Sequence, residues 1–161
     1  VVPHEPAELT TILGPCVAVC LFDRARGIGG MNHFLLAVGG GSARERSRYG
    51  DTSCEDLVQC LFASGSRPGD LEARIVGGAN VGRLIGAQGD SLGGRNAEMA
   101  RSVLRRHGIE VGFEDVGGAH ARRLRFRTGT GILEVKTIEG TSSTTATIAA
   151  GPAGEGVASA R

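Results

Sequence analysis

The chain has 161 residues, of which 40% are hydrophobic and 22% charged, and its formal net charge is +1. This length and composition predict one soluble globular domain with a sizeable core, and no apolar run is long enough for a membrane span or a secretory signal. With no Trp, five Phe and one Tyr, the sequence also argues against a nucleic-acid-binding surface built on basic and stacking side chains.

The first part of the chain predicts two strands, over residues 10–22 and 28–38. The first is interrupted at Gly14 and Pro15, because proline lacks an N–H and is excluded from central ladder positions. Both segments are apolar at almost every position, which predicts strands that are buried on both faces.

Each of these strands carries one side chain that could take part in nucleophilic chemistry. Cys16 and His33 lie on neighbouring predicted strands, which can bring a thiol and an imidazole together. The thiolate is the attacking species, and a nearby His lowers the thiol pKa enough to populate it. The alternative, and the commoner case for such residues, is a small core hydrophobe and a buried imidazole. The residues alone leave both interpretations open.

A Cys–His pair also needs a group that orients the imidazole through its second ring nitrogen. Thr10 and Thr11 both lie just upstream of Cys16 on the first strand, and either hydroxyl could serve. Each could equally be a β-branched residue that favours a strand. The spacing does not choose between them.

The middle of the chain predicts two helices separated by a strand over residues 71–76. The first helix follows Thr52, which has capping-box spacing to Glu55. The second follows a glycine-rich stretch, with Asn96 as its predicted N-cap and Gly108 as its C-terminal stop.

Three further strands are predicted over residues 109–116, 121–128 and 132–138, joined by glycine turns typical of hairpins. Residues 141–161 are rich in Ser, Thr, Ala and Gly, and we expect a flexible tail after a domain over residues 1–140. The order of elements predicts an α/β layered sandwich, with a mixed β-sheet and two main helices packed against it.

The four cysteines do not suggest a disulfide or a zinc site. Cys16 and Cys20 are about 13 Å apart on a strand at ~3.3 Å per residue, whereas a disulfide needs Cα atoms within ~7 Å. Cys54 and Cys60 are too widely spaced on one helix to face each other, and no Cys-x-x-Cys pair with matching histidines occurs. We therefore expect reduced thiols in a cytoplasmic protein with no metal or cofactor.

Several short motifs occur in order between residues 9 and 140. They are TxxxGxCVAV from Thr10, GxMxH ending at His33, RYxD from Arg48, EARIVGGA from Glu72, LGxRN ending at Asn96 and EDxGG from Glu114. Each motif is weak alone, but the ordered series resembles the CheD family of chemoreceptor glutamine deamidases.

The resemblance implies roles for three residues: Cys16 as the nucleophile, His33 as the base, and Thr10, six residues before the Cys, as the residue that orients the imidazole. Thr11 does not match that position. The implied fold is a sandwich similar to the catalytic domains of deamidating toxins. The implied activity is that of a protein-glutamine glutaminase, which hydrolyses selected glutamine side chains on methyl-accepting chemotaxis receptors to glutamate and ammonia.

The resemblance also implies partners: the receptors as substrates and a CheC-type phosphatase. We expect a cytoplasmic monomer that neither binds nucleic acid nor inserts into membranes. One departure concerns Pro15, which stands where the family usually has Ser and removes an N–H beside the nucleophile. If that N–H held the oxyanion, the loss would cost ~3 kcal/mol of transition-state stabilisation. If the donor is instead the N–H of Cys16, Pro15 only fixes the turn.

Two alternatives to the deamidase therefore stay open. One is an adaptor, weakened in catalysis by Pro15, that binds the phosphatase or the receptor. The other is a different cysteine hydrolase, such as a protease or a transglutaminase.

Overall fold

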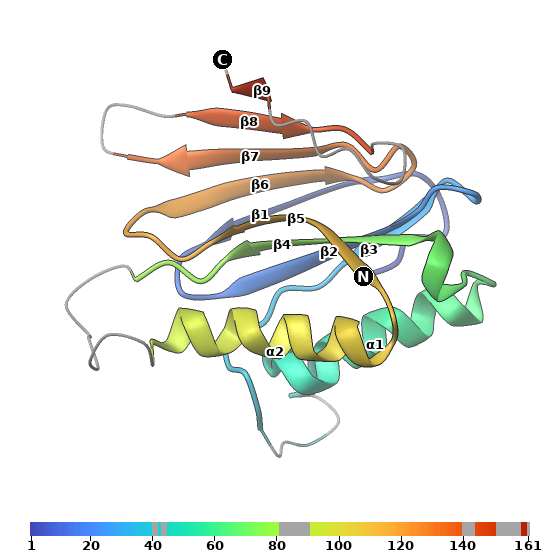
Figure 1. Ribbon diagram of the computed structural model, residues 1–161, viewed down its shortest axis with the longest axis horizontal. Helices are drawn as coiled ribbons and strands as arrows, with labels where there is room; N and C mark the ends of the chain where they lie inside the picture. The colour runs from blue at the N-terminus through green and yellow to red at the C-terminus, as the bar shows by residue number, and fades with distance from the viewer. Residues whose placement is uncertain (40–41, 43–44, 81–90, 140–143, 151–158, 161) are drawn as a thin grey trace.

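Two β-sheets and a pair of helices form three layers in the computed structural model of the chain (Figure 1). The structure describes residues 1–39, 42, 45–80, 91–139, 144–150 and 159–160. The α/β layered sandwich with two main helices, expected from the sequence, is confirmed, but its strands are divided between two sheets rather than joined in one.

The first sheet, sheet A, is five-stranded and antiparallel, in the order β1-β6-β7-β8-β9. Its strands are β1 (Glu8–Leu13), β6 (Ala121–Arg127), β7 (Leu133–Ile138), β8 (Thr145–Ile148) and β9 (Ser159–Ala160). The hairpin predicted between β6 and β7 is present.

Strand β8 lies within the segment that we expected to be a flexible tail. It pairs with β7, and its residues alternate between exposed threonines and the half-buried side chains of Ala146 and Ile148. The sequence did not predict this strand, because the segment is poor in large apolar residues. The strand turns only two side chains toward the interior, so its alternating pattern is weak. Most of the other tail residues, 141–143, 151–158 and 161, lie outside the described residues.

The second sheet, sheet B, is four-stranded and mixed, in the order β3-β2-β4-β5, with β4 and β5 parallel. Its strands are β2 (Val17–Asp23), β3 (Ile28–Met31), β4 (Leu71–Gly77) and β5 (Glu110–Val116). The predicted break at Gly14 and Pro15 is thus the point where the chain passes from sheet A to sheet B. Residues 117–120 are a second crossing and not the hairpin we predicted, because β5 pairs with β4 and β6 with β1 and β7.

Helices α1 (Gly50–Ala63) and α2 (Leu92–Arg106) cover the outer face of sheet B (Figure 1), and 3₁₀ turns η1 (Arg46–Arg48) and η2 (Pro68–Asp70) precede α1 and β4.

Both predicted helix starts are wrong by a few residues. Helix α1 begins before Thr52, whose hydroxyl donates to backbone carbonyls instead of forming a capping box. In α2 the N-cap is Ser91, whose Oγ accepts from the N–H of Gly94 at 3.0 Å, so Asn96 lies inside the helix and is fully buried.

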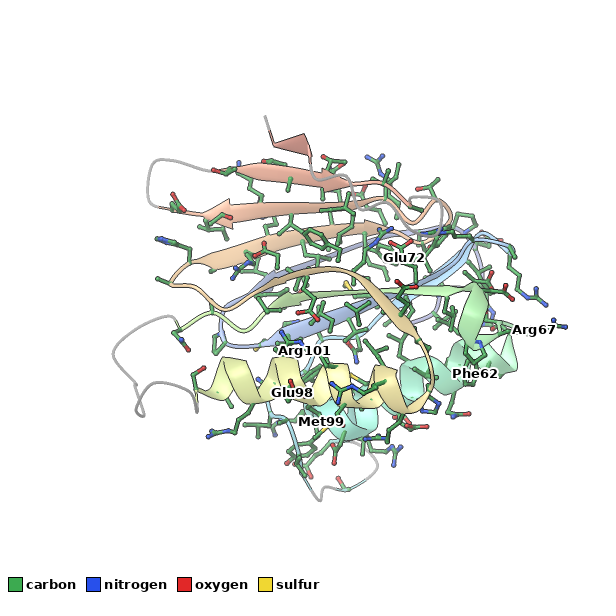
Figure 2. All side chains as sticks on the ribbon, viewed as in Figure 1. Phe62, Arg67, Glu72, Glu98, Met99 and Arg101 are labelled. Atoms are coloured by element: carbon green, nitrogen blue, oxygen red, sulfur yellow. The ribbon has the colours of Figure 1, made fainter. Side chains whose placement is uncertain are left out.

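Two apolar cores hold the layers together. One lies between the helices and sheet B and includes Leu61 and Leu104; the other lies between the sheets and includes Phe126. Polar contacts fix the helices further: Arg101 of α2, which is labelled in Figure 2, binds Glu114 of β5 at 2.7 Å.

All four cysteines are free thiols, as their spacing predicted. No helix in the described part of the chain is long and apolar enough to cross a membrane.

Candidate active site

The pairing of β2 with β3 places Cys16 and His33 on one face of sheet B. The register continues beyond the end of β3, where Val17 and Phe34 exchange two backbone hydrogen bonds of 3.1 and 3.0 Å. In this register His33 lies opposite Ala18, so Cys16 is its diagonal neighbour on the face turned toward sheet A. Diagonal neighbours have Cα atoms about 7–8 Å apart, within reach of a long side chain.

Thr11 reaches the imidazole from the opposite sheet. Its Oγ1 lies 2.9 Å from Nδ1 of His33. Strand β1 alternates, so that Thr11 is half-buried on the inner face while Thr10 is exposed. Thr10, six residues before Cys16, therefore lies on the other face of the strand, and the hydroxyl that contacts the ring in this structure belongs to Thr11. The role expected for Thr10 stays a prediction.

Burial shifts the pKa values of the thiol and the imidazole in opposite directions. Burial raises the pKa of the Cys16 thiol above its ordinary value of 9.0, and the residue's own backbone N–H opposes part of that rise. Burial also lowers the pKa of His33 below 6.5. The sulfur and the ring do not hydrogen-bond to each other among the described contacts, so the resting pair at neutral pH is a thiol beside a neutral imidazole. The expected lowering of the thiol pKa by a neighbouring His is not seen.

The backbone around Cys16 is held by the end of β4. The N–H of Gly78 donates to the Cys16 carbonyl at 2.7 Å, and the N–H of Ala79 donates to that of Gly14 at 2.8 Å. Gly77 has φ +116°, and a Cβ there would lie 2.3 Å from the Cys16 carbonyl oxygen. This approach therefore requires glycine.

One backbone donor at the nucleophile is free. Within the described part of the chain, the N–H of Cys16 donates to no acceptor on another residue, and Pro15 has no N–H to offer. A free N–H beside a thiol can stabilise the oxyanion that forms when the sulfur adds to a carbonyl.

A cavity of about 400 Å³ opens beside His33, lined by Thr10 and Thr11 of β1, Met31 of β3 and Leu57 of α1, among others. Cys16 is not among its lining residues, so the cavity adjoins the imidazole of His33 and not the thiol. In the described residues, no cluster of three or more His, Cys, Asp or Glu side chains is arranged to hold a metal ion.

Comparison with known proteins shows the family of the chain. The sequence profile described as "CheD chemotactic sensory transduction" matches residues 37–137. A protein of Thiobacillus denitrificans is 41% identical over 139 residues, which cover 84% of this chain and 68% of the relative. One of Trichlorobacter lovleyi is 39% identical over 132 residues, covering 82% and 81%. One of Burkholderia vietnamiensis is 42% identical over 136 residues, covering 82% and 54%.

Each of these three relatives is named "Probable chemoreceptor glutamine deamidase CheD", and the chain spans between 54% and 81% of their lengths. The extent of the profile match, together with this level of identity, shows that the chain belongs to the CheD family.

Proposed function

We propose that this chain hydrolyses glutamine side-chain amides on methyl-accepting chemotaxis receptors, giving glutamate and ammonia. The observation that supports the proposal is the set of Thr11, His33 and Cys16 on facing inner surfaces of the two sheets, in a chain whose relatives are named for this activity.

In the first half of the reaction, Cys16 is the nucleophile and His33 the general base. The Nδ1–H of His33 donates to Thr11 Oγ1, which leaves Nε2 with a free lone pair. Nε2 takes the thiol proton as the sulfur bonds to the amide carbon, and the N–H of Cys16 stabilises the oxyanion. Substrate binding brings the ring and the sulfur within hydrogen-bond distance, since such contacts are often long in a free enzyme.

In the second half, the protonated His33 returns its proton to the nitrogen of the amide as the C–N bond breaks. Ammonia leaves, and the acyl group stays on Cys16 as a thioester. His33 then takes a proton from water, whose oxygen attacks the thioester carbon. The C–S bond breaks, the thiol is regenerated and the product is a glutamate. Each turnover adds one negative charge to the receptor, which alters its electrostatics.

The test of this proposal is ammonia release from a purified receptor fragment by the wild-type chain and by Cys16→Ala. The expected result is release by the wild type alone, with a mass gain of about one dalton per modified glutamine and no cleavage or cross-linking. Equal release by both chains would sink the assignment. Binding without release favours the adaptor, and cleavage or cross-linking favours another cysteine hydrolase.

The hydroxyl that orients His33 can be identified with two matched variants. Thr11→Val removes the 2.9 Å contact to Nδ1 while keeping the β-branched shape, and we expect kcat to fall about 5- to 10-fold, as for the loss of a hydrogen bond worth ~1 kcal/mol. Thr10→Val is the comparison: Thr10 lines the same cavity but makes no hydrogen bond to His33 among the described contacts, so kcat should fall less than in Thr11→Val. The opposite order of effects would return the role to Thr10.

The likeness to deamidating toxins, the CheC-type phosphatase partner, the cytoplasmic location and the monomeric state stay predictions from the resemblance. Co-purification with a phosphatase of that type would test the second.

A further inference from the structure

The side chain of Asn96 joins the two segments that carry the proposed nucleophile and base. Its Nδ2 donates to the carbonyl of Pro15 at 3.1 Å and to the carbonyl of Leu35 at 2.8 Å. Asn96 comes from the first turns of α2 and is fully buried. One amide of the helix layer thus binds the residue before Cys16 and the second residue after His33.

These two hydrogen bonds lie where the ladder between the two segments stops. Val17 and Phe34 form its last backbone pair, and the next pair in the same register is Cys16 opposite Leu35. That pair exchanges no backbone hydrogen bonds in an antiparallel ladder, and the next bonding pair would be Pro15 opposite Leu36. Pro15 has no N–H, and the N–H of Leu36 donates to the carbonyl of Arg48 at 3.1 Å instead. The amide of Asn96 therefore binds the Pro15 carbonyl, which the ladder leaves without a partner, and joins it to Leu35.

The bond to Pro15 also sets the direction of the free N–H at the nucleophile. The Pro15 carbonyl and the Cys16 N–H belong to one peptide unit, which is planar and trans, so they point in opposite directions. The hydrogen bond to Asn96 holds the Pro15 carbonyl on one side of this peptide unit. The N–H of Cys16 must therefore point to the opposite side. A carbonyl that accepts a hydrogen bond also polarises its peptide, which makes the N–H a stronger donor.

We propose that Asn96 is a positioning residue for the deamidation: it aims the Cys16 N–H at the oxyanion and holds Cys16 and His33 in register. The kinetic part of this inference rests on the proposed function. The inference also gives Pro15 a role. The oxyanion donor is then the N–H of Cys16, so the missing N–H of Pro15 is not needed. Pro15 instead contributes the carbonyl that accepts a hydrogen bond from Asn96.

The test compares Asn96→Ala and the isosteric Asn96→Asp, each of which removes the two N–H donors, with a control in the same helix. The control is Val103→Ala, which removes buried apolar volume from α2 but none of the hydrogen bonds to Pro15 and Leu35. We expect both Asn96 variants to lower kcat about 100-fold with little change in KM, because misplacing a reacting group by about an ångström costs on this order. Val103→Ala should lose stability but keep kcat.

A second readout does not depend on activity. Amide hydrogen exchange at Val17 and Phe34 should be faster in the Asn96 variants than in Val103→Ala. The hydrogen bonds between Val17 and Phe34 are no longer supported by the adjacent bonds from Asn96 to Pro15 and Leu35. Unchanged exchange, or kcat within twofold of the wild type, would overturn the inference. Accelerated exchange in a chain whose wild type releases no ammonia would overturn the proposed function while the positioning role stands.

Discussion

Replacement of His33 by Gln is expected to lower kcat for glutamine deamidation about 10²- to 10⁴-fold, the usual contribution of a positioned general base. Gln is close to His in size and keeps a polar end group, but it cannot accept the proton of the Cys16 thiol. Because burial raises the pKa of that thiol, little thiolate forms spontaneously at neutral pH, and the reaction depends on the base.

The pH dependence of kcat/KM in the wild type is an independent test of His33 as the base. A base must be unprotonated to act, so kcat/KM should rise with pH through the pKa of His33. Burial lowers that pKa below its ordinary value of 6.5, which places the midpoint of the acid limb below pH 6.5. The His33→Gln variant should lose this limb.

The matched control is His120→Gln, since His120 is exposed and its nearest acidic partner, Glu139, lies at 3.8 Å. It should keep both kcat and the acid limb. An acid limb that survives in His33→Gln, or a kcat within tenfold of the wild type, would show that another group takes the proton.

The second large effect is expected at Gly77, next to the nucleophile. In Gly77→Ala the new Cβ would meet the Cys16 carbonyl oxygen at 2.3 Å, and φ +116° is a conformation that costs an L residue about 1–3 kcal/mol. The Cβ is fixed to the backbone and the atom it meets is a backbone oxygen, so relief requires the backbone at residue 77 or at Cys16 to shift. We expect a lower melting temperature and loss of most of the activity.

The Gly117→Ala variant distinguishes the effect of the steric clash with Cys16 from the effect of backbone strain at a positive φ. Gly117 has φ +79°, and a Cβ there would meet nothing within 4 Å. This control should lose stability from its backbone conformation alone and keep kcat within about twofold. Thermal unfolding and ammonia release, measured on both variants, check the prediction; comparable kcat in the two would mean that the position of the Cys16 carbonyl does not matter for turnover.

The sequence predicted the kinds of elements well, because their periodicities are local. The predicted strands and both helices follow from local sequence patterns and were found, although the segment predicted as a strand over residues 28–38 is a strand only over Ile28–Met31. The division into two sheets was missed, because it depends on which strands pair. Glycines such as Gly117 were interpreted as hairpin turns, and only tertiary pairing shows that the chain there changes sheet.

For the site, the resemblance singled out Cys16 and His33, and the structure places both on one inner face. It pointed to Thr10, whereas the hydroxyl that contacts the ring belongs to Thr11. The alternation of exposed and buried residues along β1 carried a signal for this: Leu9 and Leu13 share the inner face with Thr11, and Thr10 lies on the outer one.

Asn96 was missed for a different reason. Asparagine near a helix start is typically a cap, and the sequence has no feature that separates a capping amide from a buried one. Its partners, the carbonyls of Pro15 and Leu35, are 81 and 61 residues away along the chain, so only the folded structure could reveal them.

The contact between Thr11 and His33 crosses from one sheet to the other. An increase of about 1 Å in the separation of the two layers along this contact would stretch it from 2.9 Å to beyond the normal hydrogen-bond range. Under the proposed mechanism, the orientation of the catalytic imidazole therefore depends on how the two sheets are packed against each other.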